Sequence, residues 1–220
     1  SYVCENILKK KFSIIGFDAC LMSMLEVANI MKNYSDIMVS SQEVELGTGW
    51  NYSLVLSPLE AGGMDKISFA KHIVSAYAKT YASITNDYTL SALQLSMIPE
   101  LEENINGIAQ LLLESISREK NKSVQNIIKD CKNKVNCTHF DEPSYIDLAH
   151  FYKNLLNNLS RFEFLSASEG EMLVDYLRKA LTKGIDLINK SVLANITGRN
   201  LKNAAGISIY FPLRRLHSSY

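Results

Sequence analysis

Short apolar runs alternate with stretches of helical periodicity along most of this chain, and this alternation restricts its fold more than any other feature. Buried strands are expected at residues 12–17, 36–40, 88–95 and 206–212, where a proline ends the last one. Helices are expected at residues 21–31, 65–77, 99–116, 144–156 and 168–188, the last two capped by Ser144 and by Ser168 with Glu171. Residues 41–63 are expected to be loop, and residues 119–143 a short helix with a surface excursion. This alternation predicts an α/β fold with helices on both faces of the sheet.

The charge balance and the hydropathy exclude several classes of protein. The 220 residues include 23 basic and 23 acidic side chains, so no excess of positive charge favours nucleic acid or an anionic membrane surface. No apolar run approaches the roughly 20 residues that span a bilayer. No linker rich in proline, glycine or serine divides the chain, so we expect residues 1–220 to belong to a single domain.

The four cysteines do not form a recognisable metal or disulfide framework. Cys131 and Cys137 are near enough in sequence for one local disulfide, and His139 and His150 follow them. A zinc site there would have irregular spacing without a paired CxxC. Free thiols or one local disulfide are therefore the favoured alternatives.

The junction at Asp18-Ala19-Cys20 is the strongest candidate for chemistry, because no phosphate-binding loop, dinucleotide fingerprint, HExxH or GxSxG motif is present. If the next helix begins at once, Cys20 lies in its first turn, where the helix N-terminus favours the thiolate. Clefts also form where strands of an open α/β sheet end. On geometry alone, however, Cys20 can equally be a small core residue and Asp18 a helix N-cap.

A longer run around this junction carries a resemblance to a known family. The residues from Ile15 to Ala28 (IGFDACLMSMLEVA) resemble the signature around the catalytic cysteine of the clostripain family of caspase-like cysteine peptidases. Residues 39–43 (VSSQE) and 47–52 (GTGWNY) resemble that family's strand and specificity loop, and Asp147-Leu148 and residues 206–212 agree in order. The resemblance implies a caspase-like, mostly parallel α/β sheet, of which residues 1–220 form only the C-terminal part.

The resemblance also assigns roles to individual residues. Cys20 would be the nucleophile, and its backbone N–H would donate to the oxyanion. Asp18 would lie at the floor of the pocket for the substrate residue before the scissile bond (P1) and would pair with Arg or Lys. The pocket wall would come from Glu43, Glu45, Gly47, Thr48, Gly49 and Trp50. Thr48 stands where the family usually has a second acid, and Glu45 is the candidate substitute.

A catalytic histidine is missing from the expected place. The family has a His-Gly upstream of the cysteine, whereas no histidine precedes Cys20 here. His72, His139, His150 and His217 lie in unsuitable contexts. The resemblance therefore implies the thiol-bearing heavy chain of a processed precursor, with the histidine on a preceding segment or a light chain.

We therefore expect a cysteine endopeptidase that cleaves peptides or proteins after Arg or Lys and is matured by proteolytic processing, including autoprocessing. By family resemblance it would be a secreted or cell-envelope bacterial protein, without a nucleic-acid partner or a membrane span. Calcium is a family cofactor, although no ligand cluster for it stands out in the sequence. Two alternatives stay open: a catalytically silent peptidase-like module that holds peptides or partners in its cleft, and an unrelated α/β domain with a buried Cys20.

Overall fold

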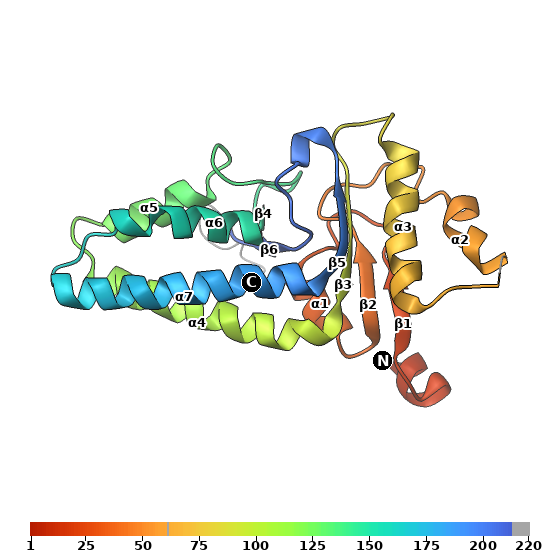
Figure 1. The fold of residues 1–220 in the computed structure, drawn as a ribbon, viewed down its shortest axis with the longest axis horizontal. Helices are drawn as coiled ribbons and strands as arrows, with labels where there is room; N and C mark the ends of the chain where they lie inside the picture. Colours follow the sequence, from red (N-terminus) through yellow and green to blue (C-terminus); the bar gives the residue numbers. More distant parts are fainter. Residues whose placement is uncertain (61, 213–220) are drawn as a thin grey trace.

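A computed structural model describes residues 1–60 and 62–212, and it shows a four-stranded sheet with helices on both faces (Figure 1). The strand order is β1 (Phe12–Gly16), β2 (Ser35–Ser40), β3 (Thr89–Gln94) and β5 (Val192–Thr197). The expected α/β fold with helices on both faces is confirmed.

The expectation of a mostly parallel sheet needs correction, because the described sheet is mixed. β1 and β2 are parallel, whereas β3 is antiparallel to both β2 and β5. The chain between β2 and β3 contains two helices, α2 (Tyr52–Glu60) and α3 (Lys66–Tyr81). The sequence pattern predicted only loop where α2 forms. With this extra helix in the connection, α3 runs in the same direction as β2, and the chain re-enters the sheet at the end where β2 leaves it (Figure 1).

Two apolar cores lie on opposite faces of the sheet. Alternate residues of β2 point to opposite sides, so that Ile37 and Val39 pack with α3 while Met38 packs with Leu93 of β3 in the other core. The second core is larger and holds α1 (Leu25–Met31), α4 (Ile98–Arg118) and α7 (Ala167–Ser191). α4 and α7 run side by side beyond the sheet, and α5 (Ser123–Lys132) and α6 (Leu148–Asn158) pack near them (Figure 1). No helix in the described ranges is long and apolar enough to cross a membrane.

A second sheet of two strands joins β4 (Tyr145–Asp147) to β6 (Ser208–Tyr210). Ser144 therefore does not cap a helix as expected. Asp147 is the cap of α6, since its side chain accepts a hydrogen bond from the His150 N–H. Ser168 also lies inside α7, whose N-cap is Ser166, so the expected capping box does not form. The remaining short helices are a π-helix at Val3–Leu8 and 3₁₀ turns at Leu95–Met97, Leu159–Arg161 and Arg199–Leu201.

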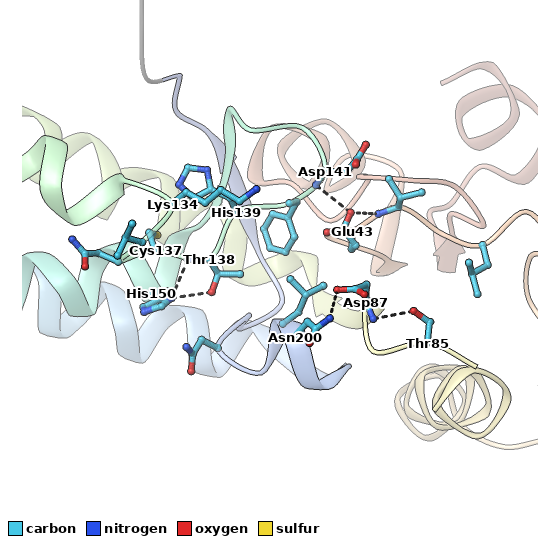
Figure 2. A pocket seen from close by; sticks show the side chains of 17 residues that line it. Glu43, Thr85, Asp87, Lys134, Cys137, Thr138, His139, Asp141, His150 and Asn200 are labelled. Atoms are coloured by element: carbon cyan, nitrogen blue, oxygen red, sulfur yellow. Dashed lines mark hydrogen bonds between the residues drawn. The ribbon is translucent and has the colours of Figure 1, made fainter. Parts of the chain in front are cut away.

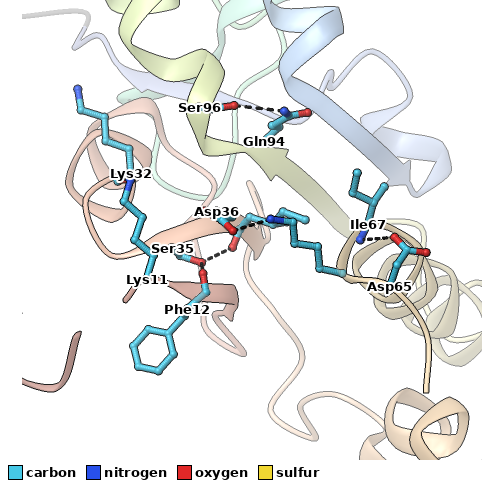
Figure 3. Close-up of polar contacts among 11 residues, drawn as sticks. Lys11, Phe12, Lys32, Ser35, Asp36, Asp65, Ile67, Gln94 and Ser96 are labelled. Carbon is cyan, nitrogen blue, oxygen red and sulfur yellow. Dashed lines mark hydrogen bonds and ion pairs between the residues drawn. The ribbon is translucent and has the colours of Figure 1, made fainter. Parts of the chain in front are cut away.

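Polar contacts secure the end of the sheet at which β1 and β2 begin (Figure 3). The Ser35 hydroxyl donates to the Phe12 carbonyl over 3.2 Å, and Lys66 Nζ lies 2.6 Å from Asp36 Oδ2. Asp65 caps α3 by accepting from two backbone N–H groups. The opposite end of these strands leads into residues 17–24 and 41–51, which contain the candidate site.

Candidate active site

Cys20 lies in an irregular turn between β1 and α1. The Phe17 N–H still donates to the Val39 carbonyl, but Leu21 has a left-handed backbone with φ +60° and α1 begins only at Leu25. The prediction that Cys20 occupies the first turn of a helix is therefore wrong. The Ser23 N–H donates to the Ser41 carbonyl. This hydrogen bond and that of Phe17 with Val39 keep the segment before Leu25 out of the helix.

The backbone of the loop after β2 surrounds the Cys20 thiol. The thiol is exposed, and the Glu45 N–H donates to Sγ over 3.4 Å while the Glu45 carbonyl lies 3.8 Å from Sγ. The Leu21 N–H donates to the Glu43 carbonyl. The thiol is thus held against the loop that was predicted to form the pocket wall.

The three other cysteines are buried free thiols. Burial raises the pKa of Cys131 to about 11 and that of Cys137 to about 12, so both stay protonated at neutral pH. Of the alternatives that the sequence left open, free thiols are therefore the ones found. Cys20 is the exposed thiol of the described chain.

Asp18 lies within two residues of Cys20 and is held by the end of the same loop. Its Oδ2 accepts hydrogen bonds from the Trp50 N–H at 3.1 Å and from the Tyr52 hydroxyl at 2.9 Å. A Cβ at Gly49 would come within 2.6 Å of the same oxygen, and Gly49 has φ +64°. Glycine is therefore needed there both for the backbone conformation and for the approach of Asp18.

The Glu45 side chain lies next to the Asp18 carboxyl group. Its side chain is buried, and Oε2 accepts from the Trp50 indole N–H at 2.9 Å. Burial and then the neighbouring Asp18 carboxyl raise the pKa of Glu45 to about 9. The structure therefore brings together two carboxyl groups beside an exposed thiol, as the sequence suggested for Asp18 and Glu45.

The other residues of the predicted pocket wall differ in their contacts. Trp50 lies in the core against Gly16, where a Cβ would come within 2.8 Å of the indole, and it supports the acids through its N–H groups. Thr48 and Gly49 are bonded to Tyr81 of α3: the Thr48 hydroxyl is 2.8 Å from the Tyr81 hydroxyl, which donates to the Gly49 carbonyl. Gly47 is exposed and has open space around its Cα.

Glu43 lies apart from this group. Its Oε1 accepts from the Val44 N–H at 2.7 Å and from the Asp141 N–H at 3.1 Å, and burial raises its pKa. Figure 2 shows that it faces a cavity of about 640 Å³ shared with Asp87 and Asp141. Glu43 has no interaction with Asp18 among the described residues.

Two tyrosines contact this site without having been singled out from the sequence, although Tyr52 ends the loop that was predicted to form the pocket wall. Tyr52 belongs to the GTGWNY run, and that position was the available signal for its contact with Asp18. Tyr81 has no such signal, since its place in the apolar pattern of α3 marks it only as core.

The described histidines lie away from the thiol. His72 contacts the Leu54 carbonyl, His139 lies between the Pro143 and Lys132 carbonyls, and His150 faces Thr138. His217 lies outside the described residues. Within residues 1–60 and 62–212, no group of three or more His, Cys, Asp or Glu side chains is placed to hold a metal ion.

Comparison with known proteins identifies the fold and the family of this chain. A sequence model of the clostripain family matches residues 4–215, whereas no curated protein matches the sequence. The fold is similar to that of a clostripain from Bacteroides thetaiotaomicron in complex with a peptide inhibitor, with a TM-score of 0.57 and 14% identity over 91% of this chain and 78% of that one.

Two further structures have TM-scores of 0.58. One is an inactive zymogen C11 protease from Parabacteroides distasonis, at 16% identity over 96% of this chain. The other is a secreted C11 cysteine protease from B. thetaiotaomicron in complex with an irreversible peptide inhibitor, at 18% identity over 94%. This chain spans 55% of each of those two chains. With the family match covering nearly the whole sequence and the same fold recurring in these proteases, the chain belongs to the clostripain family of cysteine peptidases.

Proposed function

We propose that this chain is the thiol-bearing part of a cysteine endopeptidase that cleaves peptide bonds after Arg or Lys. The observation that carries the proposal is the exposed Cys20 thiol, held by the backbone of Glu45, with the Asp18 carboxylate two residues away. An accessible sulfur beside a fixed anion suits attack on a bond that follows a basic side chain.

The chemistry needs few groups from this chain. The Cys20 thiolate attacks the scissile carbonyl carbon, and the carbonyl oxygen becomes an oxyanion that accepts from the Cys20 N–H. The C–N bond then breaks, a histidine gives the departing amine its proton, and a thioester remains on Cys20. Water attacks the thioester and transfers one proton to the histidine, and the C–S bond breaks to release the carboxylic acid and the Cys20 thiolate.

The Asp18 carboxylate would bind the cationic side chain of the P1 residue. The Tyr52 hydroxyl and the Trp50 N–H both donate to Oδ2 of Asp18. These two hydrogen bonds fix the orientation of the carboxylate and therefore the position of Oδ1. A guanidinium or ammonium group gains a charge-assisted hydrogen bond there, and an apolar side chain leaves the carboxylate without a partner.

We propose that a preceding segment of the same precursor supplies the histidine. β1 pairs with β2 alone among the described strands, so one edge of the sheet is open to a further strand. A light chain that extends the sheet at β1 would bring a histidine close to the turn after β1. The zymogen relative is consistent with proteolytic maturation, and the secreted relative with a secreted or cell-envelope location in a bacterium.

The test is cleavage of fluorogenic peptides that differ only at P1 (Arg, Lys, Gln, Leu or Asp) by the full-length protein. We expect cleavage after Arg and Lys that is lost in Cys20→Ala and kept in Cys4→Ala, which removes a buried thiol distant in sequence. Cleavage that survives Cys20→Ala would refute the assignment of the nucleophile. No cleavage of any peptide would favour the silent peptide-binding module instead.

A further inference from the structure

The Glu45 side chain is buried with only one of its two oxygens in a hydrogen bond. The residue is 7% exposed, and the Trp50 indole N–H donates to Oε2. Oε1 is buried and receives no hydrogen bond from a donor within residues 1–60 and 62–212. A buried carboxylate oxygen without a donor is costly, because it has lost its water and gained nothing in return.

The Glu45 side chain also has a second carboxyl group as a neighbour, that of Asp18, and Trp50 donates to both groups, from its backbone N–H to Asp18 and from its indole N–H to Glu45. Two carboxylates can only repel each other, whereas a carboxylic acid donates a hydrogen bond to a carboxylate. Asp18 Oδ2 already accepts from the Trp50 N–H and the Tyr52 hydroxyl. A proton on Glu45 Oε1 therefore satisfies the one oxygen that lacks a partner and turns the repulsive contact into a hydrogen bond.

Acidic and phenolic groups surround Glu45 in the described structure. The titratable groups that face Glu45 are Asp18 and Cys20 in the turn after β1, Tyr52 at the start of α2, and Tyr77 of α3. Tyr81 of α3 is nearby, bonded to Thr48 and Gly49. In the part of the chain that the structure describes, no lysine, arginine or histidine interacts with Glu45, so only a proton can offset the second carboxylate.

We propose that Glu45 and Asp18 hold a single proton between them while the pocket is empty, and that a P1 arginine or lysine displaces this proton when it binds. The inference rests on the proposed function, because it concerns the same pocket. The bound cation supplies the positive charge that the proton supplied before, so the pair releases one proton to solvent. Glu45 thereby supplies the second negative charge that the family usually has at the position of Thr48. It carries this charge only when a cation is bound.

The balance of charge gives the substrate preference a pH dependence of definite sign. A step that releases one proton becomes up to about tenfold more favourable for each unit of pH increase. A P1 citrulline has the shape of arginine without its charge, and its binding releases no proton. Ionisation of the cysteine and histidine affects both substrates alike, so it cancels in the ratio of their kcat/KM values.

The first experiment locates the proton without using activity. Infrared difference spectra of the full-length Cys20→Ala protein at pH 7 are compared with those of the same protein carrying Glu45→Gln or Glu60→Gln. Glu60 is an exposed glutamate at the end of α2 and is the matched control. We expect the carbonyl band of a buried carboxylic acid in the parent, its loss in Glu45→Gln and its retention in Glu60→Gln. Absence of that band from the parent overturns the proposal, whether or not the protein is a peptidase.

The second experiment measures the release. With full-length protein, the ratio of kcat/KM for P1 Arg over P1 citrulline is followed from about pH 7 to pH 9, a range in which arginine stays charged. We expect the ratio to rise by up to about tenfold per pH unit in the native protein and in Glu60→Gln, and to stay flat in Glu45→Gln. Cleavage after Arg with a flat ratio in the native protein overturns the release step alone. No cleavage refutes the proposed function and the release with it, while the infrared band still decides whether the proton is held.

Discussion

Asp147 connects three segments that hold the site in place, and its removal should destabilise the protein severely. The side chain is fully buried, with Oδ1 accepting from the His150 N–H at 2.7 Å. Oδ2 accepts from the Ala205 N–H at 2.7 Å and from the Gln42 side-chain amide at 3.0 Å. Gln42 directly precedes the Glu43-to-Glu45 segment, so Asp147 braces the loop that carries Glu45 and contacts the Cys20 thiol.

The magnitude follows from these three donors. Each buried donor left unpaired costs about 1–3 kcal/mol. The loss is reduced because Asp147→Ala also removes a carboxyl group whose burial is unfavourable, as the raised pKa of Asp147 indicates. We therefore expect Asp147→Ala to lower the free energy of unfolding by about 3–5 kcal/mol. Asp147→Asn keeps the shape but points an amide at a donor, and should cost about 1–3 kcal/mol.

Urea-induced unfolding of the full-length protein, in a Cys20→Ala background that prevents self-cleavage, measures these differences. Asp175→Ala is the matched control, because Asp175 is an exposed partner of Lys179 and should change stability by less than about 0.5 kcal/mol. If Asp147→Ala unfolds within about 1 kcal/mol of the parent, the idea that this carboxylate braces the site is wrong.

Three further predictions concern other parts of the chain. Because the folded protein raises the pKa of Glu45 from 4.5 to about 9, the folded state binds a proton that the unfolded state has lost between these values. The parent should therefore lose stability relative to Glu45→Gln as pH rises across this range, by up to about 1.4 kcal/mol per pH unit. A difference in urea midpoint between the two proteins that is the same at pH 5 and at pH 8 would contradict this. Gly198→Ala places a Cβ 2.1 Å from the backbone oxygen of Asn86, so its Tm should fall by several degrees, and an unchanged Tm would show that the contact is absent. Iodoacetamide should alkylate Cys131 and Cys137 at least about tenfold more slowly than Cys20 in the folded protein, with similar rates for all in urea; equal rates in the folded state would contradict their burial.

The sequence was sufficient for the start of the site but not for its exact geometry. The apolar run before Asp18 predicted β1, and a polar residue at its end predicted where the strand stops. Leu21 and Met24 fit helical spacing, so the pattern predicted a helix that reaches Cys20. The contacts of Ser23 with Ser41 and of Met24 with Ser208 override that spacing, and both partners are distant in sequence.

The pocket and the sheet show the same limit. The two acids, Asp18 and Glu45, could be named from the sequence because they lie in recognisable short runs. The fastening of the loop to Tyr81 could not, since Tyr81 is more than 30 residues away and follows an ordinary apolar pattern. The sequence did not predict α2, which lies in the connection between β2 and β3. α2 contains Pro58 and lies within residues 41–63, whose content of glycine, asparagine and serine is typical of an irregular segment.

The central claim is that Cys20 is the nucleophile beside a pocket for a basic side chain. A peptide ketone electrophile with lysine at P1, incubated with the full-length protein and mapped by mass spectrometry after digestion, tests it most directly. We expect an adduct on Cys20, formed faster than with a leucine analogue and absent from Cys4, Cys131 and Cys137. An adduct on one of those buried cysteines, or equal labelling of Cys20 by the lysine and leucine reagents, would contradict it.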